Sequence, residues 1–439
     1  MNSFINEFRS LEPTLVGNGG EIGDIRRHAI ETFASTGFPT NRQEAWRFTN
    51  VGPIAAGSFA PAPLVDLDKP ARESIAEWLN WFAAHDLVFV NGRLIEPMPG
   101  RSDPSGYMIP LDRFLETDVP RAREMLGKTA GMDEFPFTAL NTAYMCGGAA
   151  VMVPPGVVVD KPFHILHVAV ESVEPVQSHV RNLIQMGEDS EATIVESYVS
   201  LLSEPGGSSL SYFRNAVTEA SLLSNSRLTH IKIQAEGESA YHLGRTAVHQ
   251  GRDSSFTSAF FSFGSILARN EIEVCLSEPG ANADLSGIYL GLGEQHLDCQ
   301  TLVDHAAPHT SSTEIYKGVL GGRSRAVFNG RIVVRADAQK TNAQQQNRNL
   351  LISEEARVDT KPQLEILAND VKCSHGSTVG QLDPDRLFYL RSRGIDGKQA
   401  RNILVRAFAG EFIDGIQVEG VRKLVDSVLS RKLPGSEDA

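Results

Sequence analysis

The sequence is poor in cysteine and has no excess of basic residues. Its four cysteines lie far apart and form no Cys-x-x-Cys pair, so neither a closed zinc site nor a redox dithiol is expected. Lysine and arginine number 41 against 54 aspartates and glutamates, which gives a formal net charge of −13. Binding to nucleic acid phosphates needs clustered positive charge, so nucleic acid is not an expected partner.

Long apolar runs and a secretion signal are also missing. No stretch approaches the roughly 20 apolar residues that cross a bilayer. The first residues, MNSFINEFRSLEP, lack a basic segment followed by an apolar one. We therefore expect no membrane insertion and a cytoplasmic location.

Motifs for nucleotide binding and hydrolysis are absent. The sequence contains no GxxxxGK[ST] phosphate loop, no HExxH zinc helix, no GxSxG nucleophile elbow and no GxGxxG that opens a βαβ unit. The glycine-rich run from Gly318 to Arg323 lacks the lysine that would reach a triphosphate, and we expect a tight corner there. If the function consumes ATP, a partner has to bind it.

The segment 1–130 is expected to form an N-terminal helical domain. Apolar residues from Ile22 to Phe33 recur at helical spacing, and Gly37 ends that run. A second helix is expected from about Lys69 to His85, with Pro70 near its start, where a missing N–H costs little.

From about Ala149 the sequence changes to short β-branched runs separated by Gly, Pro, Ser, Asn and acidic residues. Apolar doublets then recur at short and nearly regular intervals; they are Leu302-Val303, Val319-Leu320, Val333-Val334, Leu350-Leu351 and Ile366-Leu367. This spacing is typical of a parallel β-helix with one doublet per coil. A large antiparallel sandwich fits the same spacing. We expect this core to cover residues 131–380.

Residues 381–439 are expected to form a C-terminal helical domain. Asp383 is the predicted N-cap of its first helix, followed by Pro384 at the first helical position and Gly394 past the end. Two amphipathic helices follow, with apolar stripes at Ala400, Ile403, Leu404, Ala407, Phe408 and Phe412, and at Val421, Leu424, Val425, Val428 and Leu429. Residues 433–439 are expected to fray.

The C-terminal helices are also the basic end of the chain. Residues 383–432 contain ten lysines and arginines against seven acidic residues, on a chain with an overall charge of −13. This charge is compatible with a docking surface for another protein and equally with an ordinary solvated helix face.

Chemically, the most informative segment is Lys372-Cys373-Ser374-His375-Gly376. In an extended strand, residues two apart face the same side, so Cys373 and His375 would present a thiol and an imidazole together. Both groups are suited to iron, zinc or copper. Two ligands do not complete a site, so further ligands have to come from this chain or another. A buried thiol beside a hydrogen-bonded histidine is the structural alternative. His305 and His309 are left unassigned.

A carbohydrate-cleaving enzyme on a β-helix is a second interpretation, because such enzymes use paired carboxylates in a groove. The acidic candidates would be Asp298, Asp304, Glu314, Asp337 and Asp359. Aromatic residues that would stack on sugars are sparse in this region.

Several strings of the sequence resemble the SufB/SufD family of iron–sulfur cluster assembly proteins. They are Tyr316-Lys317-Gly318, FNGRIVVRADAQKTNAQQQNRNLLIS, KPQLEILANDVKCSHGSTVG and LFYLRSRGI. The likeness is strongest from about residue 270 to 415 and extends more weakly over most of the chain. Within the family, VKCSHGST resembles the SufD branch more than the SufB branch, which characteristically carries an acidic-His-acidic pattern there.

The resemblance implies a right-handed parallel β-helix core flanked by helical N- and C-terminal domains. It also implies a non-catalytic scaffold that pairs with SufB, with a transient iron–sulfur cluster forming where the two chains meet. The C-terminal helices would dock the SufC ATPase, which alone would bind ATP. Participation of a flavin, and a homodimer of the isolated chain, stay open.

Carried over to this sequence, His375 matches the family position proposed to act with a SufB cysteine, and Cys373 is its neighbour in the same motif. The implied role of His375 is to donate a neutral imidazole to iron or to orient an incoming sulfur. A purely structural partner of SufB, without a ligand role, is the alternative.

Overall fold

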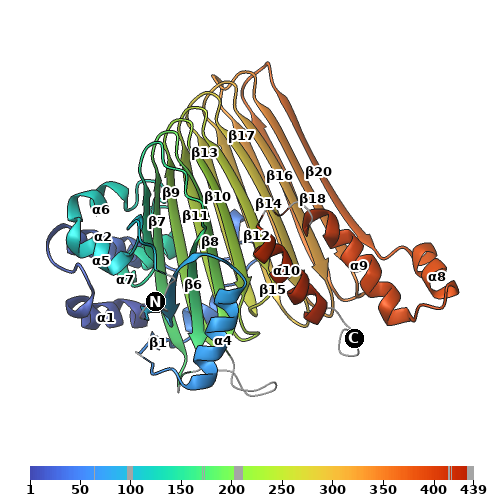
Figure 1. The fold of residues 1–439 in the computed structure, drawn as a ribbon, viewed down its shortest axis with the longest axis horizontal. Coiled ribbons are helices and arrows are strands. Elements are labelled where there is room, and N and C mark those ends of the chain that lie inside the picture. Colours follow the sequence, from blue (N-terminus) through green and yellow to red (C-terminus); the bar gives the residue numbers. More distant parts are fainter. Residues whose placement is uncertain are drawn as a thin grey trace.

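The body of the protein is a parallel β-solenoid with two sheets (Figure 1). The computed structural model describes residues 1–63, 65–95, 102–170, 172, 174–201, 211–413, 416 and 418–432. The tail expected at 433–439 lies outside the described residues. The prediction of a parallel β-helix core with helices before and after it is confirmed, and the antiparallel sandwich is wrong because the long strands pair in parallel.

Successive strands along the solenoid alternate between the two sheets. The first sheet contains β4 (Met108–Pro110), β5 (Ala149–Val153), β7 (Val176–Met186), β9 (Tyr212–Leu222), β11 (Tyr241–Gln250), β13 (Leu267–Leu276), β15 (His296–His305), β17 (Arg325–Val334) and β19 (Arg357–Ile366), with β1 (Ala60–Pro61) beside β7. The second sheet contains β3 (Arg93–Leu94), β2 (His85–Val90), β6 (Phe163–Val170), β8 (Glu191–Leu201), β10 (Arg227–Ala235), β12 (Ser255–Ser262), β14 (Asn282–Gly291), β16 (Ser311–Leu320), β18 (Asn342–Leu351) and β20 (Lys372–Gln381).

Each coil of the solenoid contains two strands and therefore two apolar doublets. From β13 onward, register partners in neighbouring coils are two doublet intervals apart in the sequence, as in Leu267↔His296 and Arg325↔Arg357. The expectation of one doublet per coil is thus wrong by a factor of two. The doublets mark single strands because each one lies near the carboxyl end of its strand, where the chain leaves one sheet for the other.

The interior of the solenoid is filled by the inward-facing row of every strand. Phe328 on β17 is 0% exposed, and its ring centroid lies 5.2 Å from that of Tyr316 on β16. Two tyrosines also lie over glycines of the adjacent strand. A Cβ on Gly287 would lie 2.4 Å from the Tyr316 ring, and one on Gly318 would lie 2.2 Å from the Tyr289 ring. Gly287 pairs in register with Tyr316, and Tyr289 pairs with Gly318. Each of the two strands therefore places a tyrosine ring over a glycine of the other.

The two ends of the solenoid differ. At the N-terminal end, β3 pairs antiparallel with β2 and β4 pairs antiparallel with β5, so these short strands interrupt the parallel stacking. At the C-terminal end, β19 and β20 are the last strands of their sheets, and each pairs on one side only. Their outer edges therefore present unpaired backbone groups, the usual template for pairing with another chain.

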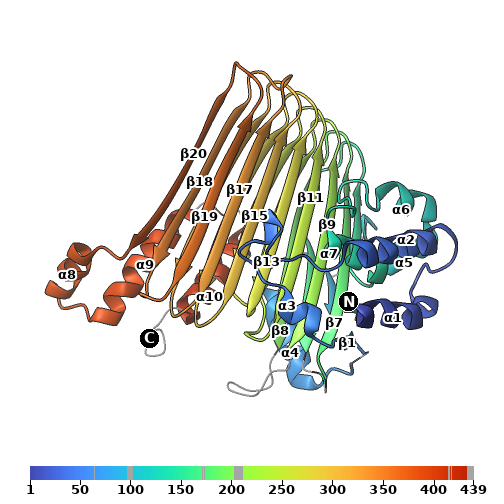
Figure 2. The same ribbon diagram turned by 180° about the vertical axis from the view of Figure 1, so that it is seen from behind.

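The N-terminal helices cover the outer face of the first sheet (Figure 2). They are α1 (Asn2–Leu11), α2 (Gly20–Thr36), α3 (Gly52–Ala56), α5 (Leu111–Thr117), α6 (Val119–Met125) and α7 (Pro136–Tyr144), with short 3-10 helices at Glu12–Thr14 and Glu44–Trp46. Phe4, Phe8 and Phe33 pack against Phe213 and Leu243 of the sheet. The segment 1–130 also contributes β1 to β4, so its packing is continuous with that of the solenoid.

Helix α4 (Lys69–Asn80) and the last two helices of the chain cover the outer face of the second sheet. The predicted start of α4 is confirmed, with Asp68 accepting a hydrogen bond from the Ala71 N–H at 2.9 Å. Its predicted end at His85 is wrong. The run HDLVFV from His85 forms β2 because it pairs with β6 and buries its apolar residues.

The C-terminal helices are α8 (Pro384–Ser392), α9 (Gly397–Ile413) and α10 (Glu419–Lys432). The predicted cap is confirmed, since Asp383 accepts hydrogen bonds from the N–H groups of α8, and the α10 stripe is buried. The α9 stripe is partly wrong because Ile403 and Ala407 are exposed. The α9 residues buried against the sheet are Val405, Ala409, Phe412 and Ile413, and of these Phe412 belongs to the predicted stripe. Within the described ranges, no helix is long and apolar enough to cross a membrane.

Replacing Phe328 by Ala is expected to lower the free energy of unfolding by about 3–5 kcal/mol, because it leaves a cavity in the solenoid core. The matched control is Phe388→Ala on α8, where the side chain is 74% exposed; it is expected to change stability by less than about 0.5 kcal/mol. Denaturant titration of both variants measures the difference. Equal loss of stability in the two variants would contradict this assignment of the core.

Candidate functional site

The two predicted ligands lie at the open C-terminal end of the solenoid. Cys373 and His375 pair in register with Ala343 and Gln345 of β18, whose side chains are buried on the inward-facing row. The two residues thus share the inward row, as the spacing predicts, and no further strand of the described chain pairs with β20 on its outer side. Cys373 is half-buried against the solenoid core, whereas His375 is exposed. Burial raises the pKa of the Cys373 thiol, which keeps it protonated at neutral pH.

Two buried polar residues lie directly behind His375 in the next two coils. Gln345 and Glu314 occupy the same register position on β18 and β16, and the Gln345 amide donates to Glu314 Oε1 at 3.1 Å. Thr301 contacts Glu314 Oε2 at 2.6 Å. Burial raises the pKa of Glu314 to about 7, so the carboxyl holds a proton through much of the neutral range.

This arrangement was not predicted from the sequence, although a signal for it was present. Glu314, Gln345 and His375 are separated by about one coil length each, so coil spacing alone places them in one row. Gln345 Oε1 is buried and has no hydrogen-bond partner within the described part of the chain. The Gln345 side chain therefore has a free hydrogen-bond acceptor, Oε1, in the coil next to the open end.

A second polar row reaches the same end of the solenoid. Ser377 on β20 and Thr360 on β19 lie 2.8 Å apart between their hydroxyl oxygens, which joins the last two strands. Thr360 also donates to Asn347 Oδ1 at 2.9 Å, and Asn347 donates to the Tyr289 hydroxyl at 3.1 Å. Polar contacts thus extend from the open end inward to β14, the fourth strand of its sheet counted from that end.

The open end does not hold a complete metal site by itself. No group of three or more His, Cys, Asp or Glu residues that could hold an ion occurs among the residues that the structure describes. Cys373 and His375 supply at most two donors, and a metal or cluster bound here needs ligands from another chain.

The unassigned histidines lie elsewhere. His305 is buried between Thr310 and Ser312, with ring nitrogens 2.8 and 2.9 Å from their hydroxyls, and burial lowers its pKa to about 4. His309 lies in an exposed turn with a positive φ of 59°. Neither residue is on β20 with Cys373 and His375.

The acidic residues considered for a carbohydrate-cleaving enzyme do not form a common groove. Glu314 faces the interior, whereas Asp298 is buried under the N-terminal segment, where it accepts a hydrogen bond from Thr49 at 2.6 Å. Asp304 and Asp359 form separate ion pairs with arginines. This arrangement provides no paired carboxylates across a cleft.

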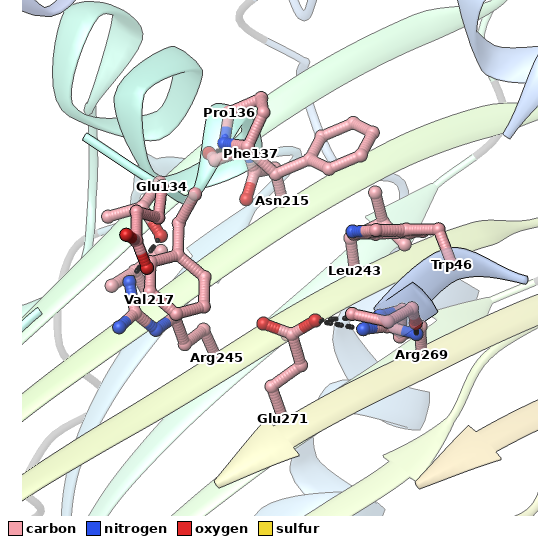
Figure 3. A pocket seen from close by; sticks show the side chains of 14 residues that line it. Trp46, Glu134, Pro136, Phe137, Asn215, Val217, Leu243, Arg245, Arg269 and Glu271 are labelled. Atoms are coloured by element: carbon pink, nitrogen blue, oxygen red, sulfur yellow. Dashed lines mark hydrogen bonds and ion pairs between the residues drawn. The ribbon is translucent and has the colours of Figure 1, made fainter. Parts of the chain in front are cut away.

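A recess of about 80 Å³ lies far from this end, on the outer face of the first sheet (Figure 3). The guanidinium of Arg245 lies 3.3 Å from the ring centroid of Phe135, and that of Arg269 lies 3.8 Å from Trp46. Glu271 accepts from Arg269 Nε at 2.7 Å. These stacked and ion-paired groups fasten the N-terminal segment to β11 and β13, and we assign no ligand to the recess.

The fold is a two-sheet parallel β-solenoid whose last strands, β19 and β20, each pair on one side only. Two family models match the sequence: the SUF system FeS cluster assembly SufBD core domain over residues 168–408, and the SufBD protein N-terminal region over residues 4–165. The chain therefore belongs to the SufBD family of iron–sulfur cluster assembly proteins, as the sequence strings indicated.

Curated relatives match along most of their length. A SufBD family iron–sulfur cluster assembly protein of Synechocystis is 32% identical over 95% of this chain and 93% of its own length. The iron–sulfur cluster assembly protein SufD of Escherichia coli is 29% identical over 92% of both chains. SufD of Bacillus subtilis is 30% identical over 69% of this chain and 68% of its own length.

Replacing Glu314 by Gln tests whether the buried carboxyl of Glu314 is protonated near neutral pH. Because the folded-state pKa lies above that of the unfolded chain, the wild-type protein loses stability as pH rises from about 4.5 to 7, by about 3 kcal/mol in all. The Gln variant cannot ionise and lacks this loss, so its stability relative to wild type should rise over the same range. Denaturant titrations at several pH values measure this difference.

The matched control for this measurement is Glu355→Gln, which changes an exposed glutamate in the turn before β19. Its stability relative to wild type is expected to stay constant within about 0.5 kcal/mol across the same pH range. A flat pH dependence for Glu314→Gln as well would show that Glu314 ionises normally.

Proposed function

We propose that the chain is the non-catalytic SufD-type scaffold subunit of a cytoplasmic SufB–SufC–SufD complex. In this proposal a nascent iron–sulfur cluster is built where the chain meets SufB, and SufC hydrolyses ATP. The observation that carries the proposal is the C-terminal end of the solenoid, where Cys373 and His375 lie on the inward row of the last strand of their sheet. The two relatives named SufD support the assignment within the family.

The edges of β19 and β20 are the proposed contact with SufB. Each strand offers a ten-residue edge, and the last coil also exposes apolar side chains that a repeat protein normally covers with a cap. Leu367 is 61% exposed, Val379 49% and Ile366 40%. A related solenoid would continue both sheets and bury these residues. In the absence of SufB, a second copy of the chain would use the same edges.

The chemistry proposed for this junction follows from the donors that are present. A neutral His375 imidazole binds iron directly, whereas Cys373 has to lose its proton first, so cluster binding through the thiol releases a proton. SufB would supply the remaining ligands. The cluster is the cargo of the site, which is assembled and then passed on.

Replacing His375 by Ala is expected to abolish cluster assembly and leave the complex intact, because the change removes a ligand from an exposed position. The measurement is co-expression with SufB and SufC from the same source, anaerobic purification, and iron and sulfide analysis. We expect at least a tenfold loss of both per complex.

The matched control is His28→Ala on α2, where the histidine is also exposed. It is expected to retain the wild-type content of iron and sulfide. An intact His375→Ala complex with unchanged iron and sulfide would make the chain a purely structural partner of SufB.

The proposed SufC contact is the protruding α8–α9 region (Figure 1). Phe388 is 74% exposed, Tyr389 57% and Ile403 44%, so three large apolar side chains lie on the surface of the basic C-terminal segment. Exposed aromatic residues of this kind are typical anchors of a protein interface.

Replacing Phe388 by Asp should therefore reduce the SufC recovered with the chain by at least tenfold while SufB recovery is unchanged. Co-purification through a tag on this chain measures both partners. The control is Val158→Asp, which changes a side chain that is 61% exposed before β6. Full SufC recovery with Phe388→Asp would exclude this surface as the docking site.

A further inference from the structure

Gln345 carries a buried hydrogen-bond acceptor whose role the proposed function leaves open. The residue is 3% exposed, and its Oε1 is buried without a hydrogen-bond partner among the residues that the structure describes. Buried polar atoms without a partner are rare in native proteins, and a functional role is one of the reasons for which they occur. The surroundings of Gln345 therefore indicate which donor this oxygen would take.

The direction of the Gln345 amide is set from the core side of the solenoid. Its Nε2 donates to Glu314 Oε1 at 3.1 Å, and Glu314 Oε2 lies 2.6 Å from the Thr301 hydroxyl. Glu314 occupies the same register position one coil farther from the open end. The nitrogen and the oxygen of an amide lie on different sides of its carbon. A nitrogen directed at Glu314 thus leaves Oε1 directed toward the last coil.

His375 is the residue of the last coil that occupies this register position. Neighbouring strands of a sheet are about 4.8 Å apart, so the two side chains lie side by side. Gln345 Oε1 and His375 Nε2 are equally many bonds away from their Cα atoms, so they reach the same depth. The imidazole is exposed, and its side-chain torsions are free to turn the ring over the amide.

The facing strands offer no competing donor at this position. Gln345 extends across the coil to Gly330 on β17, where an added Cβ would lie 2.3 Å from its Nε2. Pro362 pairs in register with Gly330 and takes its place in the last coil. Proline has no polar side-chain atom and no backbone N–H. The ring N–H of His375 is therefore the donor that the last coil presents to Gln345.

We propose that Gln345 is a positioning residue, which accepts a hydrogen bond from the Nε2–H of His375 when a partner covers the last coil. A neutral imidazole carries its proton on one nitrogen only. A proton held on Nε2 leaves the lone pair of Nδ1 for iron. Histidine ligands of metals almost always donate their second ring N–H to an acceptor of the protein. The inference rests on the proposed function, since it supplies the support of the proposed ligand His375.

The first test is the crystal structure of the complex with SufB and SufC. His375 Nε2 is expected about 3 Å from Gln345 Oε1. Gln345→Met keeps the length of the side chain and removes the acceptor, so the ring should leave this position. The matched control is Gln250→Met on β11. Gln250 is also fully buried with an Oε1 that has no partner among the described residues, but it lies well before the last coil.

Iron and sulfide analysis of the anaerobically purified complexes measures the consequence. Gln345→Met should contain at least threefold less iron and sulfide per complex than the wild type, whereas Gln250→Met should retain the wild-type content. Gln345→Glu restores an oxygen beside His375, and two adjoining carboxyls can share a proton, so the contact with Glu314 is kept. This variant should recover at least half of the wild-type content, which a merely structural role of the amide does not predict.

Unchanged iron and sulfide in an intact Gln345→Met complex would overturn the inference, as would a wild-type complex in which the His375 ring points away from Oε1. Failure of the proposed function is a different result, namely unchanged iron and sulfide in His375→Ala. If Gln345→Met does not assemble, the wild-type structure and Gln345→Glu still decide the question. A Gln345→Glu complex that assembles but contains as little iron as His375→Ala also contradicts the inference.

Discussion

Parallel stacking in register is the constraint on which the rest of this structure depends. Each residue of a strand lies beside the residue one coil away, so a side chain is fixed by neighbours that are distant in the sequence. The hydrogen bonds of the ladder hold this register through the last coil. As a result, residues at the same register position form rows along the solenoid axis, and each row ends with a residue of the last coil.

The inward rows contain both apolar and polar residues, and the two kinds have different consequences. The apolar members, such as Phe328 and Ile332, stabilise the coils by removing surface from water. The polar members form one row that ends at Ser377, which is hydrogen-bonded to Thr360, and one that ends at His375, which lies in register with Gln345. An open end that combines unsatisfied strand edges with ordered polar rows suits a junction between two related chains more than it suits an isolated active site.

The sequence was sufficient for the parts of the fold that depend on local patterns. Doublet spacing was compatible with a parallel solenoid and with an antiparallel sandwich, and the family resemblance favoured the solenoid. The Asp383-Pro384 pair predicted where a helix begins. The same-side placement of Cys373 and His375 followed from strand periodicity. The Lys69 helix was extended too far because the apolar run after it reads as helix or strand until its pairing partner is known.

The buried charges inside the solenoid were not predictable in this way. Lys232, Arg214 and Glu236 look like solvent-facing positions in a sequence, because charged residues are almost always at the surface. Only the register reveals that they face one another inside the coil. The prediction of the buried α9 stripe was partly wrong for a related reason. The contacts with the sheet determine which face of the helix is buried, and that face differs from the predicted apolar stripe.

The reciprocal placement of Tyr289 and Tyr316 over Gly318 and Gly287 restricts how the sequence of this region can change. Adding a side chain at either glycine collides with a ring, and removing either ring leaves a hole above a residue with no side chain. Neither partner can therefore drift alone. An exchange of glycine and tyrosine within one pair requires both of its residues to change together, so each pair acts as one unit of substitution that spans two adjacent coils.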